Sequence, residues 1–154
     1  MKPKILSLLF WHFILFFLFY ELRIVLEEQS LAEFQSWLLL KDGLLNLSSL
    51  VVFFLYSLGA YFVLLYTYPH SYLGMIGGIL GVSILTIAIR FLIEEVFFLQ
   101  VFGFDNFYEM PFWKYGLRNF FYAILHLSLG IVFFFVQYSG HQKEQAQQLI
   151  IENK

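Results

Sequence analysis

The sequence has little of the charge that a soluble protein needs. Of its 154 residues, 13% are charged and 60% are hydrophobic, and the mean hydropathy is +0.75. A soluble domain carries charge on about a quarter of its residues. Nine basic residues against eleven acidic ones also leave no cationic face for nucleic acid. The composition therefore excludes an ordinary soluble enzyme, a disordered tail and a nucleic-acid-binding protein.

Cysteine is absent, and so are the common catalytic motifs. A chain without cysteine has no disulfide framework, no cysteine zinc site and no cysteine nucleophile. The sequence also contains no glycine-rich phosphate loop, no HExxH helix and no serine nucleophile elbow. We therefore expect no catalytic residues, no metal site and no cofactor in this chain.

Long apolar runs are abundant instead. A bilayer core of about 30 Å requires about 20 apolar residues per helix, and its lipid offers no partner for an unpaired backbone group. The first run exceeds the 7–15 residues or so of a signal-peptide core and continues into acidic residues, so we expect a retained helix. The sequence predicts an all-α membrane protein, an antiparallel bundle of four transmembrane helices at residues 5–26, 44–66, 71–98 and 117–138.

The connections between these runs differ in length. The turn at residues 67–70 is tight, so the second and third helices are expected to be antiparallel neighbours. Ser30 and Glu33 fit a capping box, which predicts a short helix lying in the membrane interface. Residues 100–116 are aromatic and interrupted by glycine and proline, which is typical of an interfacial loop.

The C-terminal segment changes character abruptly. Residues 141–154 are rich in Gln, Glu and Lys and contain no helix breaker, so they predict the start of a cytoplasmic signalling helix after a transmembrane domain at 1–140. The positive-inside rule compares lysines and arginines on the two sides of the membrane, and Arg118 at the outer edge of the fourth span reduces the bias. The rule still favours both termini in the cytoplasm, by Lys2, Lys4, Lys143 and Lys154 against Lys41 and Lys114.

Charged residues inside apolar helices suggest a functional site, because they are costly in lipid. At about 1.5 Å of rise per residue, Arg23 lies roughly 27 Å from Ile5 and Arg90 roughly 25 Å from Leu73, which places both near the outer boundary. Each is followed four residues later by a glutamate, on the same helix face. The candidate ligand-binding or switch residues are Arg23, Glu27, Arg90, Glu94, Glu95, Arg118 and Asn119.

Two interpretations of these charges remain open. They could form a polar cluster between the helices that opens outward and binds a ligand or ion. Alternatively, they are boundary residues whose long side chains reach the lipid headgroups. His12 and His126 pose a similar choice, between a pair of axial haem ligands and ordinary hydrogen bonding between helices.

Small residues are concentrated in the third helix. Gly74, Gly77, Gly78 and Gly81 include two small-xxx-small spacings, which allow helix backbones to approach closely. The contact is expected with the second helix of the same chain, and a homodimer seam is the alternative. Asn46, Ser48 and Ser49 are expected to form ordinary hydrogen bonds between helices.

Three motifs follow one another in the second half of the sequence. They are Arg90 with the paired Glu94 and Glu95, a Gly-Phe-x-Asn-aromatic stretch at residues 103–107, and an Asn-aromatic-aromatic-Tyr-Ala helix start at Asn119 to Ala123. In these motifs and their order, the sequence resembles the membrane region of bacterial sensor histidine kinases of the LytS/YehU type, in the four-span variety. The resemblance covers roughly residues 84–154.

The resemblance implies a sensory module of a two-component system in the bacterial inner membrane. It implies a homodimer whose fourth helix relays a stimulus to a cytoplasmic kinase region and so to a response regulator. This chain departs from the family because it contains neither the box with the phosphoacceptor histidine nor an ATP-binding domain. The alternative is a free-standing small membrane protein, such as a transporter or channel subunit or an assembly partner.

Overall fold

The computed structural model describes residues 4–18, 40–104 and 110–152, and these residues form helices and no β-strand. Three helical stretches are long and apolar enough to cross a membrane, namely Gly43–Thr67, Tyr72–Phe102 and Phe112–Glu152. The prediction of an all-helical membrane protein is confirmed at this level. Helix α1, at Ile5–Phe16, is a shorter apolar helix, and residues 19–26 of the expected first span lie outside the described residues.

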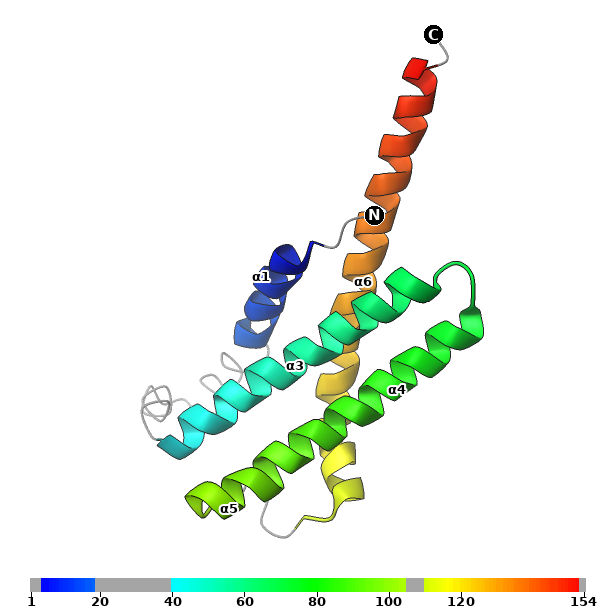
Figure 1. Cartoon of the computed structure of the whole chain (residues 1–154). Coiled ribbons are helices and arrows are strands. Elements are labelled where there is room, and N and C mark those ends of the chain that lie inside the picture. The colour runs from blue at the N-terminus through cyan, green and yellow to red at the C-terminus, as the bar shows by residue number, and fades with distance from the viewer. Residues whose placement is uncertain (1–3, 19–39, 105–109, 153–154) are drawn as a thin grey trace.

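Helix α3, at Leu40–Thr67, is the central element of the bundle. It packs against α6 (Phe112–Glu152) and α4 (Tyr72–Phe91), and α1 lies across it (Figure 1). Its buried residues recur in neighbouring pairs every four positions. This spacing matches one face of an α-helix. They are Ser48, Ser49, Val52, Phe53, Tyr56, Ser57, Ala60, Tyr61 and Leu64.

The turn between α3 and α4 is as short as the sequence predicts. Helix α4 begins after Ser71, whose hydroxyl accepts a hydrogen bond from the backbone N–H of Gly74 at 3.0 Å. This is an ordinary N-cap, which satisfies one of the free N–H groups of the first turn. The turn lies on the same side of the bundle as the N-terminus and the protruding end of α6 (Figure 1).

The segment expected to be a loop at residues 100–116 is largely helical at both ends. Helix α5, at Phe98–Phe102, is capped by Gly103, whose φ of 73° is the left-handed conformation that glycine adopts without a steric penalty. Helix α6 begins at Phe112, directly after Pro111, where a missing N–H costs nothing. Residues 105–109 lie outside the described part of the chain.

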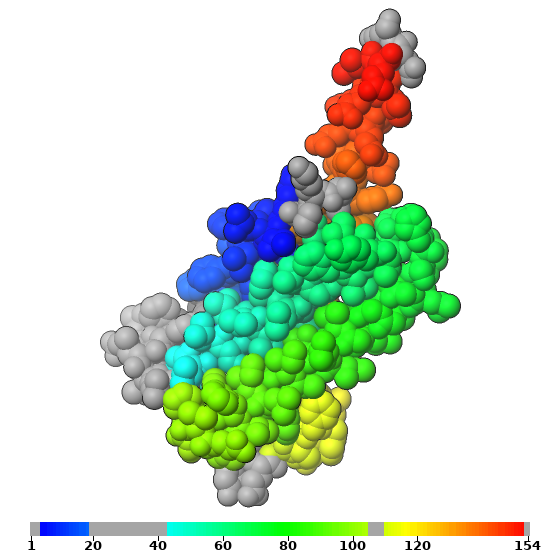
Figure 2. Space-filling view, viewed as in Figure 1, coloured from blue at the N-terminus to red at the C-terminus, as the bar shows by residue number. Residues whose placement is uncertain are grey.

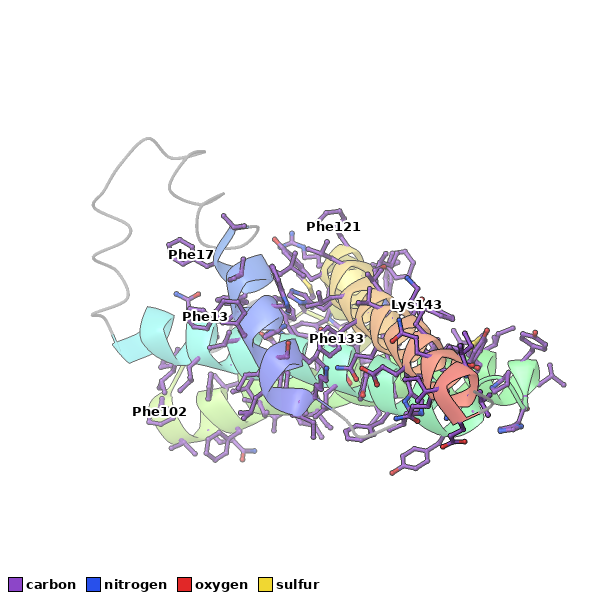
Figure 3. All side chains as sticks on the ribbon, turned by 90° about the horizontal axis from the view of Figure 1, so that it is seen from above. Phe13, Phe17, Phe102, Phe121, Phe133 and Lys143 are labelled. Atoms are coloured by element: carbon purple, nitrogen blue, oxygen red, sulfur yellow. The ribbon has the colours of Figure 1, made fainter. Side chains whose placement is uncertain are left out.

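Helix α6 is longer than the expected span. It runs without interruption through the predicted boundary near residue 138 and includes the polar segment to Glu152. The last turns project beyond the other helices (Figure 2). Large aromatic side chains on the outer faces point away from the bundle, as expected for contact with lipid, and include Phe13, Phe17 and Phe121 (Figure 3).

Candidate functional site

Arg90 and Glu94 form an ion pair inside the bundle. Arg90 is 3% exposed and Glu94 is 0% exposed, and the Nε of Arg90 donates to Oε1 of Glu94 at 2.9 Å. These side chains therefore do not extend outward to lipid headgroups. Because an unpaired charge in a membrane interior is costly, the pair must be held by further partners.

The helix changes form where the acidic side chains are located. Residues Leu92–Phe97, labelled η3, form a π-helix between α4 and α5, and this segment contains both Glu94 and Glu95. A π-helical turn is wider than an α-helical turn and occurs often at functional sites. Both carboxylates are buried, although they are adjacent in the sequence.

Two serines of α3 complete one side of the network. The hydroxyl of Ser48 donates to Oε1 of Glu94 at 3.1 Å, and Arg90 donates from Nη2 to the hydroxyl of Ser49 at 2.8 Å. The neighbouring serines thus bind opposite members of the ion pair. Their hydrogen bonds attach α3 to the junction of α4 and η3.

The first turns of α6 complete the other side. The hydroxyl of Tyr115 donates to Oε2 of Glu94 at 2.7 Å, and Arg90 donates from Nη1 to Oδ1 of Asn119. Asn119 in turn donates from Nδ2 to the carbonyl of Tyr115 at 2.8 Å, which fixes the orientation of its amide. Tyr115 and Asn119 are one helical turn apart, so both face the ion pair.

An aromatic layer lies beneath the guanidinium. The Cζ atom of Arg90 is 4.6 Å from the centre of the Phe53 ring, a cation–π distance. The Phe53 ring also stacks with the ring of His126, with centroids 4.8 Å apart. The network therefore continues from the ion pair into the centre of the bundle.

His12 and His126 do lie together, as the sequence allows. Their ring centroids are 4.9 Å apart, and the Nε2 of His12 donates to the carbonyl of Leu50 at 3.1 Å. Because the rings contact each other directly, there is no space between them for a porphyrin with two axial ligands. The arrangement fits packing and hydrogen bonding between helices α1, α3 and α6.

The remaining candidate residues divide by position. Glu95 is buried beside the network, whereas Arg118 lies on an exposed face of α6. Arg23 and Glu27, with the capping box at Ser30 and Glu33, lie outside the described residues. The structure thus brings together Arg90, Glu94, Glu95 and Asn119 from the predicted set.

The glycines of α4 divide between two faces. A Cβ atom added at Gly78 would be 2.7 Å from a methyl group of Val63 on α3, so this glycine permits the contact with the second long helix. A Cβ at Gly74 would meet the Ser71 cap at 3.0 Å. Gly77 and Gly81 have open space, so they do not contribute to packing within the described chain.

Sequence reasoning misses one member of the network, Tyr115, which falls in the expected loop at residues 100–116. Ser48 and Ser49 do form hydrogen bonds between helices, as expected, but the sequence does not predict that their partners are the two members of the ion pair. One signal was available: two adjacent serines in a run without charge must face a polar partner if buried. The pairing of Tyr115 with Asn119 at a spacing of four is a second signal.

The arrangement of these side chains is better suited to coupling the helices to one another than to catalysing a reaction. Both carboxylate oxygens of Glu94 and all three nitrogens of the Arg90 guanidinium have partners, which come from α3, α4, η3 or α6. A displacement of α6 relative to α3 must break a hydrogen bond to one of the charges. Two packed arrangements of such a network are typically separated by a free-energy barrier, since an unpaired buried charge is costly.

Comparisons with known proteins give no assignment. No protein-family model, no curated protein and no solved structure matches this chain.

Proposed function

We propose that the chain is a multi-pass membrane module that senses a stimulus and relays it along α6. The observation that carries this proposal is the continuity of α6. A single helix joins Tyr115 and Asn119 in the buried network to the projecting polar turns that end at Glu152. A change in the network therefore has a direct helical path out of the bundle.

The stimulus is expected to act where the network is located. The network lies at the end of the bundle opposite to the protruding turns of α6 (Figure 1). With both termini in the cytoplasm, that end is the extracytoplasmic one. A ligand or membrane change that separates α6 from η3 would release Asn119 or Tyr115 from the ion pair, and α6 would shift or rotate.

The remaining parts of the proposal follow from the sequence. Residues 5–26 would form the first of four spans, in a bacterial inner membrane, and two copies would pair through the polar segment at 141–154. The output would be a cytoplasmic kinase region and its response regulator, as the resemblance to LytS/YehU-type sensors implies. That region would be supplied by further sequence or by a partner chain.

The test measures whether substitutions in the buried network change how the C-terminal turns of α6 pack between two copies of the chain. Single cysteines are introduced at each position from 144 to 151 in the naturally cysteine-free chain, and oxidative crosslinking between copies is measured in membranes. Glu94→Gln retains the size of the side chain but removes the charge opposite Arg90. We expect the crosslinking maximum to move to different positions in Glu94→Gln and Asn119→Leu.

Lys114→Gln is the matched control, because Lys114 is an exposed residue in the same turn of α6 as Tyr115. Its crosslinking pattern is expected to be that of the unmodified chain. A second readout is autophosphorylation of a kinase region fused after Lys154, which should change several-fold in the two network variants. Unchanged crosslinking and unchanged kinase output in both would reject the relay and favour a free-standing membrane subunit.

A further inference from the structure

A groove between α1 and α6 lies at the end of the bundle away from the ion pair. Its volume is about 490 Å³, and its walls are mostly apolar. Phe133, which belongs to its wall, lies between the two helices in the view along the bundle (Figure 3). The lining residues are Lys4, Ser7, Trp11, Leu129, Val132, Phe133, Val136 and Gln137.

The lining follows one face of each helix. On α1 and just before it, Lys4, Ser7 and Trp11 are spaced by three and four residues, which places them in one row. Along α6 the lining runs from Leu129 to Gln137, about 12 Å at the helical rise of 1.5 Å per residue. The groove is therefore elongated, with polar side chains at one end and apolar side chains along its length.

Gln137 leaves a hydrogen-bond donor without a partner at this groove. Its Oε1 accepts a hydrogen bond from the hydroxyl of Tyr61 at 2.8 Å, which fixes the amide. Its Nε2 is buried and has no hydrogen-bond partner among the described residues. Buried polar groups are rarely left unpaired, so an acceptor from outside the chain would satisfy this one once a ligand in the groove displaces the side chains that cover it.

A second groove lies on the other side of the same ridge of α6. Its volume is about 540 Å³, and it shares Val132 and Val136 with the first groove. Its polar end contains Ser139 and Lys143. Two apolar grooves thus flank one ridge, and each has a lysine at the polar end.

We propose that these two grooves bind one anionic phospholipid with two acyl chains. The chains would lie on either side of the ridge formed by Val132 and Val136. The phosphate would be located near Lys4 and Lys143, and an ester carbonyl would accept a hydrogen bond from Nε2 of Gln137. In the topology of the proposed function both lysines lie at the cytoplasmic surface, where basic side chains attract anionic headgroups.

Trp11 lines the groove, so its fluorescence can report on lipid bound there. The chain has three tryptophans, so Trp37→Phe and Trp113→Phe leave Trp11 as the only indole. This full-length variant is placed in phosphatidylcholine nanodiscs. Its fluorescence is then titrated with phosphatidylglycerol brominated on the acyl chains, and in parallel with brominated phosphatidylcholine.

We expect the phosphatidylglycerol to quench Trp11 at a lower mole fraction than the phosphatidylcholine. Each lysine near an anionic headgroup contributes about a fivefold preference, so Lys4→Gln with Lys143→Gln should remove about 25-fold at low salt. Gln137→Glu retains an acceptor for Tyr61 but places an anion in the groove, and it should reduce the preference as well. Lys114→Gln, at the other end of α6, should leave it unchanged.

Equal quenching by the two lipids would overturn the proposal, because it would indicate only the lipid that surrounds any membrane protein. A preference that survives in the double lysine variant, or that falls equally in Lys114→Gln, would overturn it too. Helix content measured by circular dichroism identifies any variant that fails to fold. If the double lysine variant fails to fold, the same titration is carried out with Gln137→Glu alone. An unchanged preference for phosphatidylglycerol in that variant would overturn the proposal.

Discussion

The two ends of α6 within the bundle are attached in different ways. Near its start, Tyr115 and Asn119 make hydrogen bonds to a buried ion pair. Near residue 134 the helix is attached mainly by aromatic rings, beside one hydrogen bond from Tyr61 to Gln137. Tyr68 packs edge-on against Phe134 and Tyr138, with centroids 5.7 and 5.2 Å apart. The first attachment depends on direction and charge, and the second depends on contact area.

This difference indicates where a small change has a large effect. Hydrogen bonds to a buried charge lose most of their strength when a partner moves away, and the charge is left without compensation. Aromatic packing tolerates several ring geometries, so a displaced ring finds another favourable contact. In the proposed relay, the end with the ion pair would therefore act as the switch, and the aromatic end would keep α6 attached to the bundle.

The largest effect is expected from Arg90→Met, which leaves Glu94 buried with no cation opposite it. Removal of one partner of a buried pair costs about 3–5 kcal/mol. The free energy of unfolding, measured by SDS titration from detergent micelles, should fall by that amount. Addition of Glu94→Gln should recover part of the loss, and an equal loss in Lys114→Met would contradict the assignment.

A smaller loss is expected from Tyr115→Phe, which removes only the hydroxyl that donates to Glu94 at 2.7 Å. A hydrogen bond to a charged group contributes about 1.5–3 kcal/mol. The same SDS titration checks this value. Tyr66→Phe is the control, since Tyr66 is 77% exposed, and it should leave the unfolding midpoint unchanged.

Gly130→Ala tests the point between the two ends, where α6 crosses α3. A Cβ atom at Gly130 would be 2.1 Å from the carbonyl oxygen of Ser57, so the helices would have to separate. Overpacking of this kind costs about 1–3 kcal/mol. Gly140→Ala is the control, because a Cβ atom at Gly140 has open space around it and no such cost is expected. If the two variants were equally stable to heat, the helices would not be in tight contact at the crossing.

The smallest effect is expected at the aromatic end. Phe134→Leu keeps an apolar side chain at a buried site, so the loss is about 0.5–1.5 kcal/mol, the usual contribution of aromatic pairs beyond their area. Phe121→Leu on the lipid-facing surface serves as its control. If Phe134→Leu lowered the free energy of unfolding more than Arg90→Met does, the aromatic end, and not the ion pair, would be the stronger attachment of α6.

The sequence predicts the helices well, because hydropathy and length decide them in lipid. The runs at 44–66 and 71–98 correspond to helices at Gly43–Thr67 and Tyr72–Phe102. The end of α6 is less predictable, since no residue between Tyr138 and Glu152 stops a helix. Gly140 alone is insufficient, because a helix already formed tolerates one glycine at a cost of about 1 kcal/mol.

The site was predictable only in part. The spacing of Arg90 and Glu94 places them on one helix face, and this relation is local in sequence. Their partners Ser48 and Ser49 lie more than 40 positions away, and which face of α3 meets α4 depends on close contacts such as that of Gly78 with Val63. The π-helix that buries Glu95 beside Glu94 has no clear sequence signal.

The close crossing at Gly130 has a geometric consequence for α6 as a rigid rod. The crossing acts as a fulcrum, with about 17 Å of helix on the Asn119 side and about 33 Å on the Glu152 side at 1.5 Å per residue. A lever with arms in this ratio doubles a displacement. A movement of about 1 Å at Asn119 would therefore swing the far tip by about 2 Å.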